Sequence, residues 1–538
     1  MTTRPPDQHG EDASARAVSS WAPLRSAVFR ALWIAVLVSN VGNWMQTVGA
    51  QWLLVNQAHA AILVALVQVA DTLPDALFEL VGGVLADIFD RRRLLLLVQI
   101  GFGAVAIALA LLTLLGQMTP PLLLLFTFVL GSATVFTNPA YQSLVPDLVS
   151  KRELRAAAAL GSIGINLARV VGPALAGLLI ARLGVAAVFA VNALTYVFFA
   201  LAITIWKPPS RPRPALPEHF LPAIRAGFGY VRNAPIVERI LLRVGLFLIP
   251  ASVLWSLLPL IATQRLHLGA AGYGLLLGAL GAGAVAGALV LPALGRRLSD
   301  NQLMVAASLA YAVPLALIAA VPSTVVAVLV LLAAGAAWVA VLSSMNAALQ
   351  LFLPAWVRAR AISVYLMLLF GAQAVGALLW GLVADVVGVV PTFLIAAALL
   401  IVGAATIRWW PLISTAGMDR STVAPWPEPQ LIFDPGLGGG PVVVRNVYTI
   451  GPDKVTPFLQ AMERVRLSRL RTGASRWGLY RDGERANTFV EMFSVPSWEE
   501  HLRQHRDRLT GTDRDYDAQA RALSDPPPEA SHLIAVED

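Results

Sequence analysis

The sequence contains no cysteine among its 538 residues, and charged residues are scarce. The missing cysteines exclude disulfides, thiolate catalysis and cysteine-ligated metal sites. Asp, Glu, Lys and Arg make up 13% of the chain and hydrophobic residues 57%, whereas a soluble globular protein carries roughly 25% charged residues. Most of the chain therefore suits a lipid environment. Residues 1–27 are polar and have no apolar core, so we expect a cytoplasmic tail and no cleavable signal peptide.

The formal net charge of +8 does not indicate a nucleic-acid partner. Residues 441–538 hold 14 basic and 15 acidic residues, so the positive excess lies on residues 1–440, mostly in short loops. Short basic loops orient membrane helices, whereas nucleic-acid binding gathers basic residues in a patch. We therefore expect membrane lipid, and no nucleic acid, as a partner.

Twelve stretches reach the roughly 20 predominantly apolar residues that a membrane-spanning helix needs. They cover approximately residues 29–55, 61–85, 94–116, 120–141, 156–181, 184–206, 236–262, 270–292, 302–320, 322–345, 359–383 and 387–410. Alternate loops between them are basic, and positive charge favours the cytoplasmic side. The pattern predicts an all-α, multi-pass membrane protein with both termini in the cytoplasm.

The first six stretches and the last six repeat each other. Residues 138–146 align with residues 346–354 at an offset of 208, with Asn, Ala, Gln and Pro in register. Parallel six-helix repeats related by an axis along the membrane normal are a known transporter architecture, with the substrate site between the halves. We expect one half over residues 28–206, a central cytoplasmic loop over 207–235 and a second half over 236–410.

A short polar run lies between the second and third stretches. Residues 83–93 read G-V-L-A-D-I-F-D-R-R-R. This run resembles the signature loop between helices 2 and 3 of major facilitator superfamily transporters, although Asp90 stands where that family usually has glycine. The resemblance implies alternating access, with this loop helping to hold the outward-facing state closed on the cytoplasmic side. The alternative is that the arginines only set topology. The expected gating residues are Gly83, Asp87, Asp90, Arg91, Arg92 and Arg93.

Three further motifs narrow the resemblance. Residues 138–142 read N-P-A-Y-Q, residues 146–149 read P-D-L-V and residues 166–173 read N-L-A-R-V-V-G-P. With the arginine run, they resemble the transmembrane secretion effector branch of the superfamily, which includes siderophore exporters. The resemblance implies a secondary active exporter of an amphipathic small molecule, such as a drug or a siderophore, in a bacterial inner membrane. We predict proton antiport and no cofactor. Nutrient symport and a membrane-tethered enzyme are the alternatives.

Three carboxylates of the second stretch, Asp71, Asp75 and Glu79, share one helix face because they are spaced i, i+4, i+8. Asp71 lies about 24 Å along the helix from Asp87, near mid-membrane. A carboxylate there costs a few kcal/mol and normally faces a cavity or a partner. Because burial disfavours the charged form, we predict that these residues couple transport to protons. The alternative is that they line a wet vestibule, or pair with a base, and never titrate.

Arg169 lies midway along the fifth stretch, and its permanent charge needs a carboxylate, a water-filled cavity or an anionic substrate. Substrate contact and pairing with the carboxylates of the second stretch both remain open. Trp44 and Trp255 suit an aromatic-walled pocket, whereas Arg243 is expected to snorkel to the interface. The remaining candidates either line the substrate cavity or join helices by hydrogen bonds: Asn40, Asn43, Gln46, Gln51, Asn138, Tyr141 and Asn346.

Small residues recur in the fifth stretch at Gly164, Gly172, Pro173 and Gly177. They resemble the glycine-rich helix 5 motif of antiporters and drug exporters of the superfamily, and that resemblance implies export. The alternative is ordinary close packing, because small residues let helix backbones approach each other.

Residues 411–440 are rich in Pro and Gly, a linker composition. Beyond them, strands expected at 442–448, 477–480, 488–493 and 532–536 alternate with helices expected at 455–470 and 497–509. The order β-α-β-β-α-β predicts a cytoplasmic, ferredoxin-like α+β domain over residues 441–538. It resembles dimeric α+β-barrel domains such as the antibiotic-biosynthesis monooxygenase family, which implies a dimerisation or regulatory module.

One segment of this domain, Glu499, Glu500, His501 and His505, suggests a metal site because the two histidines are spaced i, i+4. No third ligand stands at a telling spacing, and the expected helix is highly charged. The pattern therefore favours a solvated helix face, and we predict no metal site.

Overall fold

The computed structural model describes residues 19–206, 227–415, 417–424 and 431–536, except for the side chains at positions 80, 83–84 and 86–88. The predicted N-terminal tail and central loop therefore lie largely outside the described residues. Twelve helices in the described part are long and apolar enough to cross a membrane. Helices suit these apolar stretches because lipid cannot satisfy backbone hydrogen bonds, so the segment must do so itself.

The first six of these helices are α1 (Ala27–Leu54), α2 (Ala60–Ile88), α3 (Arg91–Leu114), α4 (Pro120–Leu148), α5 (Leu154–Leu183) and α6 (Val185–Ile205). The second six are α8 (Pro235–Leu260), α9 (Ala270–Gly295), α10 (Asp300–Ala320), α11 (Thr324–Phe352), α12 (Ala355–Val387) and α13 (Val389–Ala405). Every predicted stretch overlaps one of them, so the twelve-helix prediction is confirmed.

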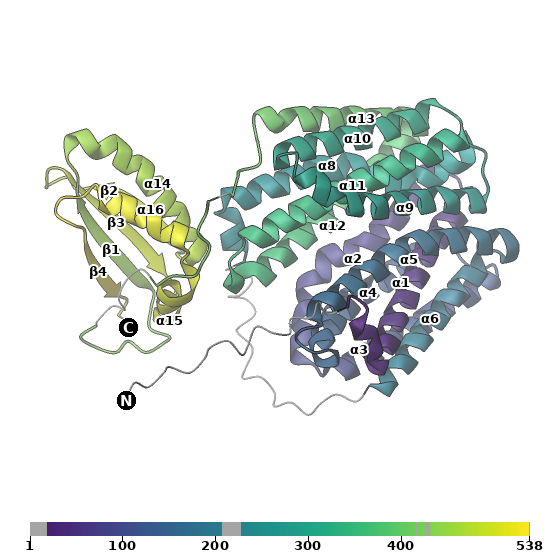
Figure 1. The fold of residues 1–538 in the computed structure, drawn as a ribbon, viewed down its shortest axis with the longest axis horizontal. Helices are drawn as coiled ribbons and strands as arrows, with labels where there is room; N and C mark the ends of the chain where they lie inside the picture. The colour runs from purple at the N-terminus through teal and green to yellow at the C-terminus, as the bar shows by residue number, and fades with distance from the viewer. Residues whose placement is uncertain (1–18, 207–226, 416, 425–430, 537–538) are drawn as a thin grey trace, which may run out of the picture.

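The helices form two groups of six, which Figure 1 shows as an upper group, α8–α13, and a lower group, α1–α6. Helix α2 packs along α12 and α5 packs along α9, so these two pairs join the halves. Alternate loops are basic, as in the sequence. We call the end of the bundle with residues 91–93 and 296–297 the arginine-rich end, and the opposite end the arginine-poor end.

Arg243 of α8 is 1% exposed, so the prediction that it snorkels to the interface is wrong. Its guanidinium instead donates to the carbonyl oxygens of Gly403, Thr406 and Trp410 and to the Thr406 hydroxyl. The last carbonyls of a helix have no partner within the helix. Arg243 therefore occupies the end of α13, and the carbonyl groups there replace the water that its charge would otherwise need.

The C-terminal part of the chain is an α+β domain, as predicted. Its strands β1 (Val442–Thr449), β2 (Arg476–Arg481), β3 (Thr488–Val495) and β4 (Glu529–Ile534) form an antiparallel sheet of order β2-β3-β1-β4. Helix α14 (Val455–Thr472) matches its prediction. The helix expected over 497–509 is α15 (Trp498–Arg503) followed by a π-helical turn, Gln504–Arg508. We refer to residues 442–536 as the tail domain.

The prediction omitted one helix of the tail domain, α16 (Gly511–Arg521). This helix has few apolar residues, and it docks largely through buried carboxylates. Asp513 pairs with Arg471, and Asp517 pairs with Arg469 at 2.6 Å. Burial is the largest effect and would raise the pKa of both carboxyls. The nearby arginines and the hydrogen bonds to each carboxylate together hold each pKa below its ordinary range. A search for apolar periodicity cannot find a helix held in this way.

The tail domain rests on the second half of the bundle, beside the arginine-rich end (Figure 1). The Arg508 guanidinium lies 4.9 Å from the ring centre of Trp356 in α12. A second contact runs through the segment before the domain: residues 419–423 bond to residues 509–512, and Arg420 donates to the carbonyl of Leu351 at the end of α11. Among the described residues, these contacts reach α11 and α12, so the domain is docked on one half.

Candidate functional site

A polar cavity of about 160 Å³ lies within the first half, between α1, α2 and α4. Its lining includes six of the residues singled out from the sequence and four that were not. The lining residues are Asn40, Asn43, Trp44, Gln46, Thr47, Asp71, Asp75, Leu130, Gly131 and Thr134. The cavity therefore brings the helix 1 amides and two of the three helix 2 carboxylates together.

Asp71 and Asp75 face this cavity from α2 and are held by hydroxyl groups. Thr47 Oγ1 of α1 donates to Asp71 Oδ2 at 3.4 Å, and Thr134 Oγ1 of α4 donates to Asp75 Oδ1 at 3.3 Å. Among the described residues, no Lys, Arg or His forms an ion pair with either carboxylate. A buried carboxylate without a counter-charge is far more costly when ionised than when protonated. Glu79 lies two turns beyond Asp71 and is partly exposed.

A glycine in α4 allows this helix to approach α2 closely beside the two carboxylates. A Cβ on Gly131 would lie 2.8 Å from the Asp71 carbonyl oxygen, so only glycine fits there without a shift. Pro74 interrupts α2 between the two aspartates, and a proline inside a helix removes a backbone hydrogen bond. The carboxylates thus stand on an irregular stretch of α2, against a tightly apposed neighbour.

Arg169 of α5 lies over an aromatic ring, and no carboxylate of the described residues pairs with it. Its guanidinium carbon is 5.9 Å from the ring centre of Trp44, which lines the cavity. The ring centre of Trp255 lies 5.8 Å from that of Trp44, and the ring centre of Trp338 lies 5.4 Å from that of Trp255. The three rings form an aromatic row that crosses from α1 to α8 and α11. Pairing with the helix 2 carboxylates, one of the two alternatives, is not what this structure contains.

Two buried donors beside this row have no partner among the described residues. They are Arg169 Nε and Trp255 Nε1. Buried polar groups are nearly always hydrogen-bonded, so each unpaired donor requires an explanation. Both flank Trp44 at the contact between the two halves, where an acceptor-rich ligand would satisfy them.

The remaining polar candidates divide between cavity lining and contacts within the protein. Gln46 accepts from Asn192 of α6, and Asn43 accepts from the Tyr196 hydroxyl at 3.2 Å. Asn138 and Tyr141 line a second, small cavity that also includes Asn40 and Asn43. Asn346 of the second half accepts from Gln350. The first half therefore supplies most of the polar lining that the structure describes.

The helix 5 glycines are places of close helix contact. A Cβ on Gly172 would lie 2.6 Å from Trp44 Cβ of α1, and a Cβ on Gly177 would lie 2.5 Å from the Ala270 carbonyl oxygen of α9. Pro173 contributes its carbonyl oxygen to the same α5–α9 contact, 2.5 Å from a Cβ on Gly274. A Cβ on Gly164 would meet Trp33 at 3.6 Å, an ordinary contact.

The halves are sealed against each other at the arginine-poor end. Gln51 of α1 is 2% exposed; it donates to the Trp255 carbonyl at 3.1 Å and accepts from the Tyr273 hydroxyl. His59 before α2 lies 3.0 Å from Asp385 of α12. With the Gly177 contact, these interactions join α1, α2 and α5 to the second half. The cavity is therefore closed off from the arginine-poor end.

The arginine run lies at the opposite end, and its described contacts stay within the first half. Asp90 caps α3 by accepting from the Arg93 amide at 2.8 Å. Arg91 donates to the Ser143 carbonyl and lies 3.4 Å from Asp147, both in α4. Arg92 donates to the Thr204 carbonyl of α6. The side chains of the other two predicted gating residues, Gly83 and Asp87, lie outside the described residues.

Some residues of the cavity and of the aromatic row were not predicted, because their sequence signals are weak. Thr47 is one helical turn from Asn43, and Thr134 and Gly131 stand in an apolar stretch where small or hydroxyl residues are common. Their role depends on the packing of α1 and α4 against α2, which no local pattern encodes. Trp338 is the third ring of the aromatic row and stands alone in an apolar run.

The solvated-face prediction in the tail domain is wrong for two residues. His501 is 1% exposed and His505 is 8% exposed. His501 stands in α15 and His505 in the π-helical turn that follows it, and His532 of β4 lies beside both. Glu499 and Glu500 point elsewhere and pair with Arg503. The third histidine is 27 residues beyond His505, so spacing along the chain could not reveal it.

Known proteins with similar sequences are transporters and exporters by name. A family model described as transmembrane secretion effector matches residues 18–538. Similar curated proteins include the enterobactin exporter EntS of Shigella boydii, 32% identical over 256 residues (46% of this chain and 59% of the relative). The staphyloferrin A transporter of Staphylococcus aureus is 27% identical over 162 residues (30% and 41%). The chain thus spans about half the length of the curated relatives that it matches.

Solved structures share the helix arrangement. The nucleoside transporter NupG has a TM-score of 0.58 at 16% identity, covering 71% of this chain and 100% of that chain. A bacterial homologue of the lysosomal transporter Spinster, inward-facing and unoccupied, has a TM-score of 0.58 at 17% identity, covering 71% and 96%. At these identities the likeness establishes the fold alone, that of major facilitator transporters, as the sequence predicts.

Proposed function

We propose a transport function for this chain, which belongs to the transmembrane secretion effector family because that family's model matches residues 18–538. The proposed activity is proton-driven export of an amphipathic small molecule of the siderophore class, by alternating access. The observation that carries it is the polar cavity, whose wall holds Trp44 and two carboxylates, Asp71 and Asp75, that have no counter-charge among the described residues. Arg169 lies on the Trp44 ring. The names of the relatives, an enterobactin exporter and a staphyloferrin A transporter, support the substrate class.

We infer that the arginine-rich end faces the cytoplasm of a bacterial cell, with both termini there, since basic loops favour that side. The conformation described above, closed at the arginine-poor end, is then the inward-facing state. We assign no enzymatic role to the tail domain, since the matched family and relatives are named for secretion and transport.

Proton coupling is assigned to Asp71 and Asp75. Each has a hydroxyl donor and a place on the cavity wall, but neither has a fixed positive partner among the described residues. A proton is the smallest available counter-charge in such a site. Uptake of that proton when the cavity opens at the arginine-poor end, and its release when the cavity opens at the arginine-rich end, would link inward proton flow to export.

Replacing Asp71 or Asp75 with Asn should reduce proton-driven transport to background, because the amide cannot gain or lose a proton. We would measure uptake of enterobactin into inverted vesicles with an imposed pH gradient, together with proton release. Glu238→Gln, at an exposed position of α8, is the matched control and should transport normally. Wild-type transport in both aspartate variants would rule out this coupling site.

Arg169 is proposed to contact an anionic part of the substrate. Its buried Nε lacks a partner among the described residues, and its charge rests on the Trp44 ring. Arg169→Gln should weaken transport of anionic amphipathic dyes by about tenfold or more, because a hydrogen bond to a charged group contributes roughly 1.5–3 kcal/mol. Neutral dyes should lose little, and Arg182→Gln at the end of α5 is the control. Equal losses for both classes of dye would indicate a structural role.

The two ends of the bundle are proposed to close alternately. Gly177 and the Gln51 contacts close the arginine-poor end, as described above. By its resemblance to the family motif, Asp87 with Gly83 and residues 90–93 would close the arginine-rich end in the other state. Two substitutions should therefore shift the conformational balance in opposite directions.

Because the chain has no cysteine, Asn40→Cys supplies a single reporter in the cavity. Gly177→Ala adds a methyl group 2.5 Å from the Ala270 carbonyl, so it should increase labelling by an impermeant maleimide added outside intact cells. Asp87→Asn should decrease that labelling. Gly101→Ala, where a Cβ would meet nothing within 4 Å, is the control. Shifts in the same direction would contradict alternate closure by these residues.

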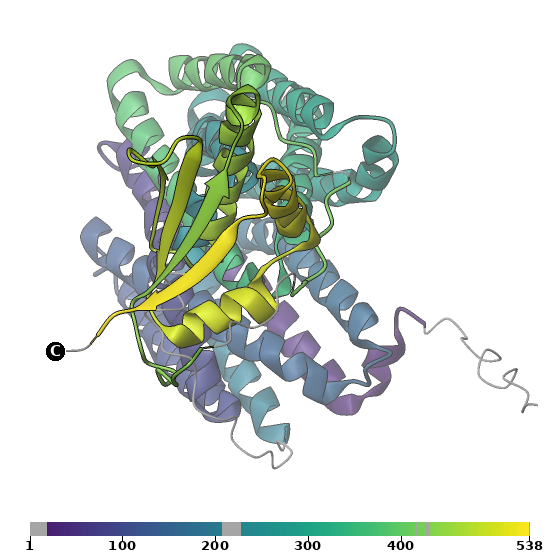
Figure 2. The ribbon, with the colours of Figure 1, turned by 90° about the vertical axis from the view of Figure 1, so that its left-hand side faces the viewer.

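Dimerisation is proposed to use the outer face of the tail sheet. Figure 2 views the tail domain from the side away from the bundle, with the sheet in front. Val443, Val447 and Leu533 point from that face, opposite the buried Val444, and Leu533 is 51% exposed. Leu533→Asp should lower the dimer fraction of the full chain in detergent, measured by light scattering. Leu459→Asp on α14, at 46% exposure, should leave it unchanged; a monomeric wild type would refute the proposal.

A further inference from the structure

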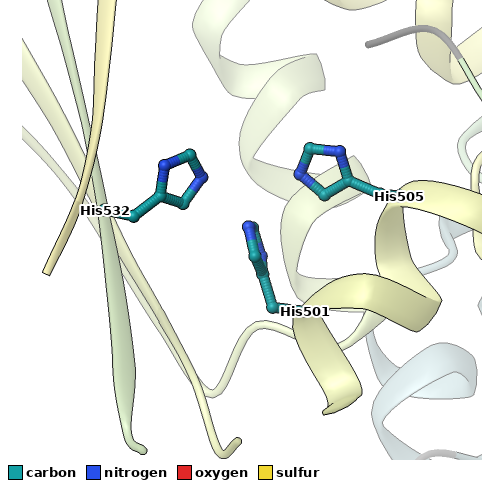
Figure 3. Close-up of side chains that lie close together, drawn as sticks. All are labelled: His501, His505 and His532. Atoms are coloured by element: carbon teal, nitrogen blue, oxygen red, sulfur yellow. The ribbon is translucent and has the colours of Figure 1, made fainter. Parts of the chain in front are cut away.

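Three histidines from separate elements of the tail domain converge on one point. Figure 3 shows the rings of His501, His505 and His532 facing one another, from α15, the π-helical turn and β4. A potential ligand nitrogen of each ring lies within 4.8 Å of the others. The ring centres are 4.6 Å apart for His501 and His505, and 4.9 Å apart for His501 and His532.

We propose that His501, His505 and His532 bind a divalent transition-metal ion of the Zn²⁺ type. Imidazole is a preferred ligand for zinc, and three protein ligands with one open position are typical of zinc sites that also bind water or a small molecule. Hard cations such as Mg²⁺ and Ca²⁺ take oxygen ligands instead. The site would be separate from the transport cavity and from the contact between the tail domain and the bundle.

The geometry needs little adjustment to hold a metal. Zinc–nitrogen bonds of about 2.0–2.1 Å in a tetrahedral arrangement place the ligand nitrogens about 3.4 Å apart. With a largest separation of 4.8 Å, small side-chain rotations would bring the three nitrogens to one ion. The backbone of α15 and that of β4 already hold the rings on the same side of the sheet, because His532 pairs with the inward-facing Val444.

Burial is the second observation. Among the described residues, nothing accepts from or donates to either ring nitrogen of His501 in good geometry, although the residue is 1% exposed. Such a group is rare in a folded protein and often marks an ion or water site. Gln504 lies beside the His501 ring but donates its side-chain amide to Thr472 at 2.8 Å. The Gln504 side chain also interacts with the His501 ring and could orient a metal-bound histidine.

The local backbone is the third observation. His505 stands in a π-helical turn, and such turns are rare and occur often at functional sites. Trp498 packs against His501 at 5.4 Å and against His532 at 6.2 Å, providing an apolar wall on one side.

The test uses the full-length chain in detergent, purified with a tag that contains no histidine and stripped with a chelator. Calorimetric titration with ZnCl₂ should show one ion per chain, and CoCl₂ should give a visible absorption band of low-coordinate cobalt. MgCl₂ should give neither signal. Each histidine-to-alanine variant should lose Zn²⁺ affinity by about 100-fold or more, beyond the loss typical of outer-shell changes.

His59→Ala, an exposed histidine 3.0 Å from Asp385, is the control and should bind as the wild type does. His532→Gln, on the edge strand, tests the site even if the variants of the two buried histidines misfold; hydrogen exchange of β1 and β3 would verify its fold. Absence of stoichiometric Zn²⁺ binding to the wild type, or unchanged affinity in a folded His532→Gln variant, would overturn the proposal.

Discussion

A charged side chain inside a membrane must be solvated by the protein itself, and this constraint decides where each charge in the bundle lies. Arg243 meets it completely, because the carbonyl groups at the end of α13 surround its guanidinium. Asp71 and Asp75 meet it only in part, each with one threonine hydroxyl and a cavity. Arg169 rests on an aromatic face with a donor unused by the described residues. A charge whose hydrogen bonds are all made within the protein stabilises the fold. A charge with unused hydrogen-bonding capacity can still bind a proton or a ligand.

The sequence was sufficient for features that depend on local pattern. Apolar stretches of spanning length located all twelve helices, and the i, i+4 spacing correctly placed Asp71 and Asp75 on one face. The strand order of the tail followed from alternation and turns. Features that depend on contacts between residues far apart in the sequence could not be predicted from local pattern. The partners of Arg243 lie 160 or more residues away, α16 docks by ion pairs, and His532 meets His501 only after the sheet forms.

Glycine positions show the same division between local and distant causes. Gly177, Gly274 and Gly381 occur in apolar stretches where glycine is common, and each turns out to touch a backbone or methyl group of the other half. Contacts between backbones have no long side chains to rearrange, so they are formed or broken as a unit. Such backbone contacts suit an interface between the two halves that opens and then re-forms with the same residues in contact.

The position of the tail domain has a consequence for movement. The described contacts of the tail domain with the bundle reach α11 and α12. In a rigid rotation of one half against the other, the tail domain would therefore move together with the second half. Two chains joined through their outer sheet faces would then have their second halves tied together. In each chain the first half would then be the part that moves, while the joined second halves and tail domains form the stationary frame.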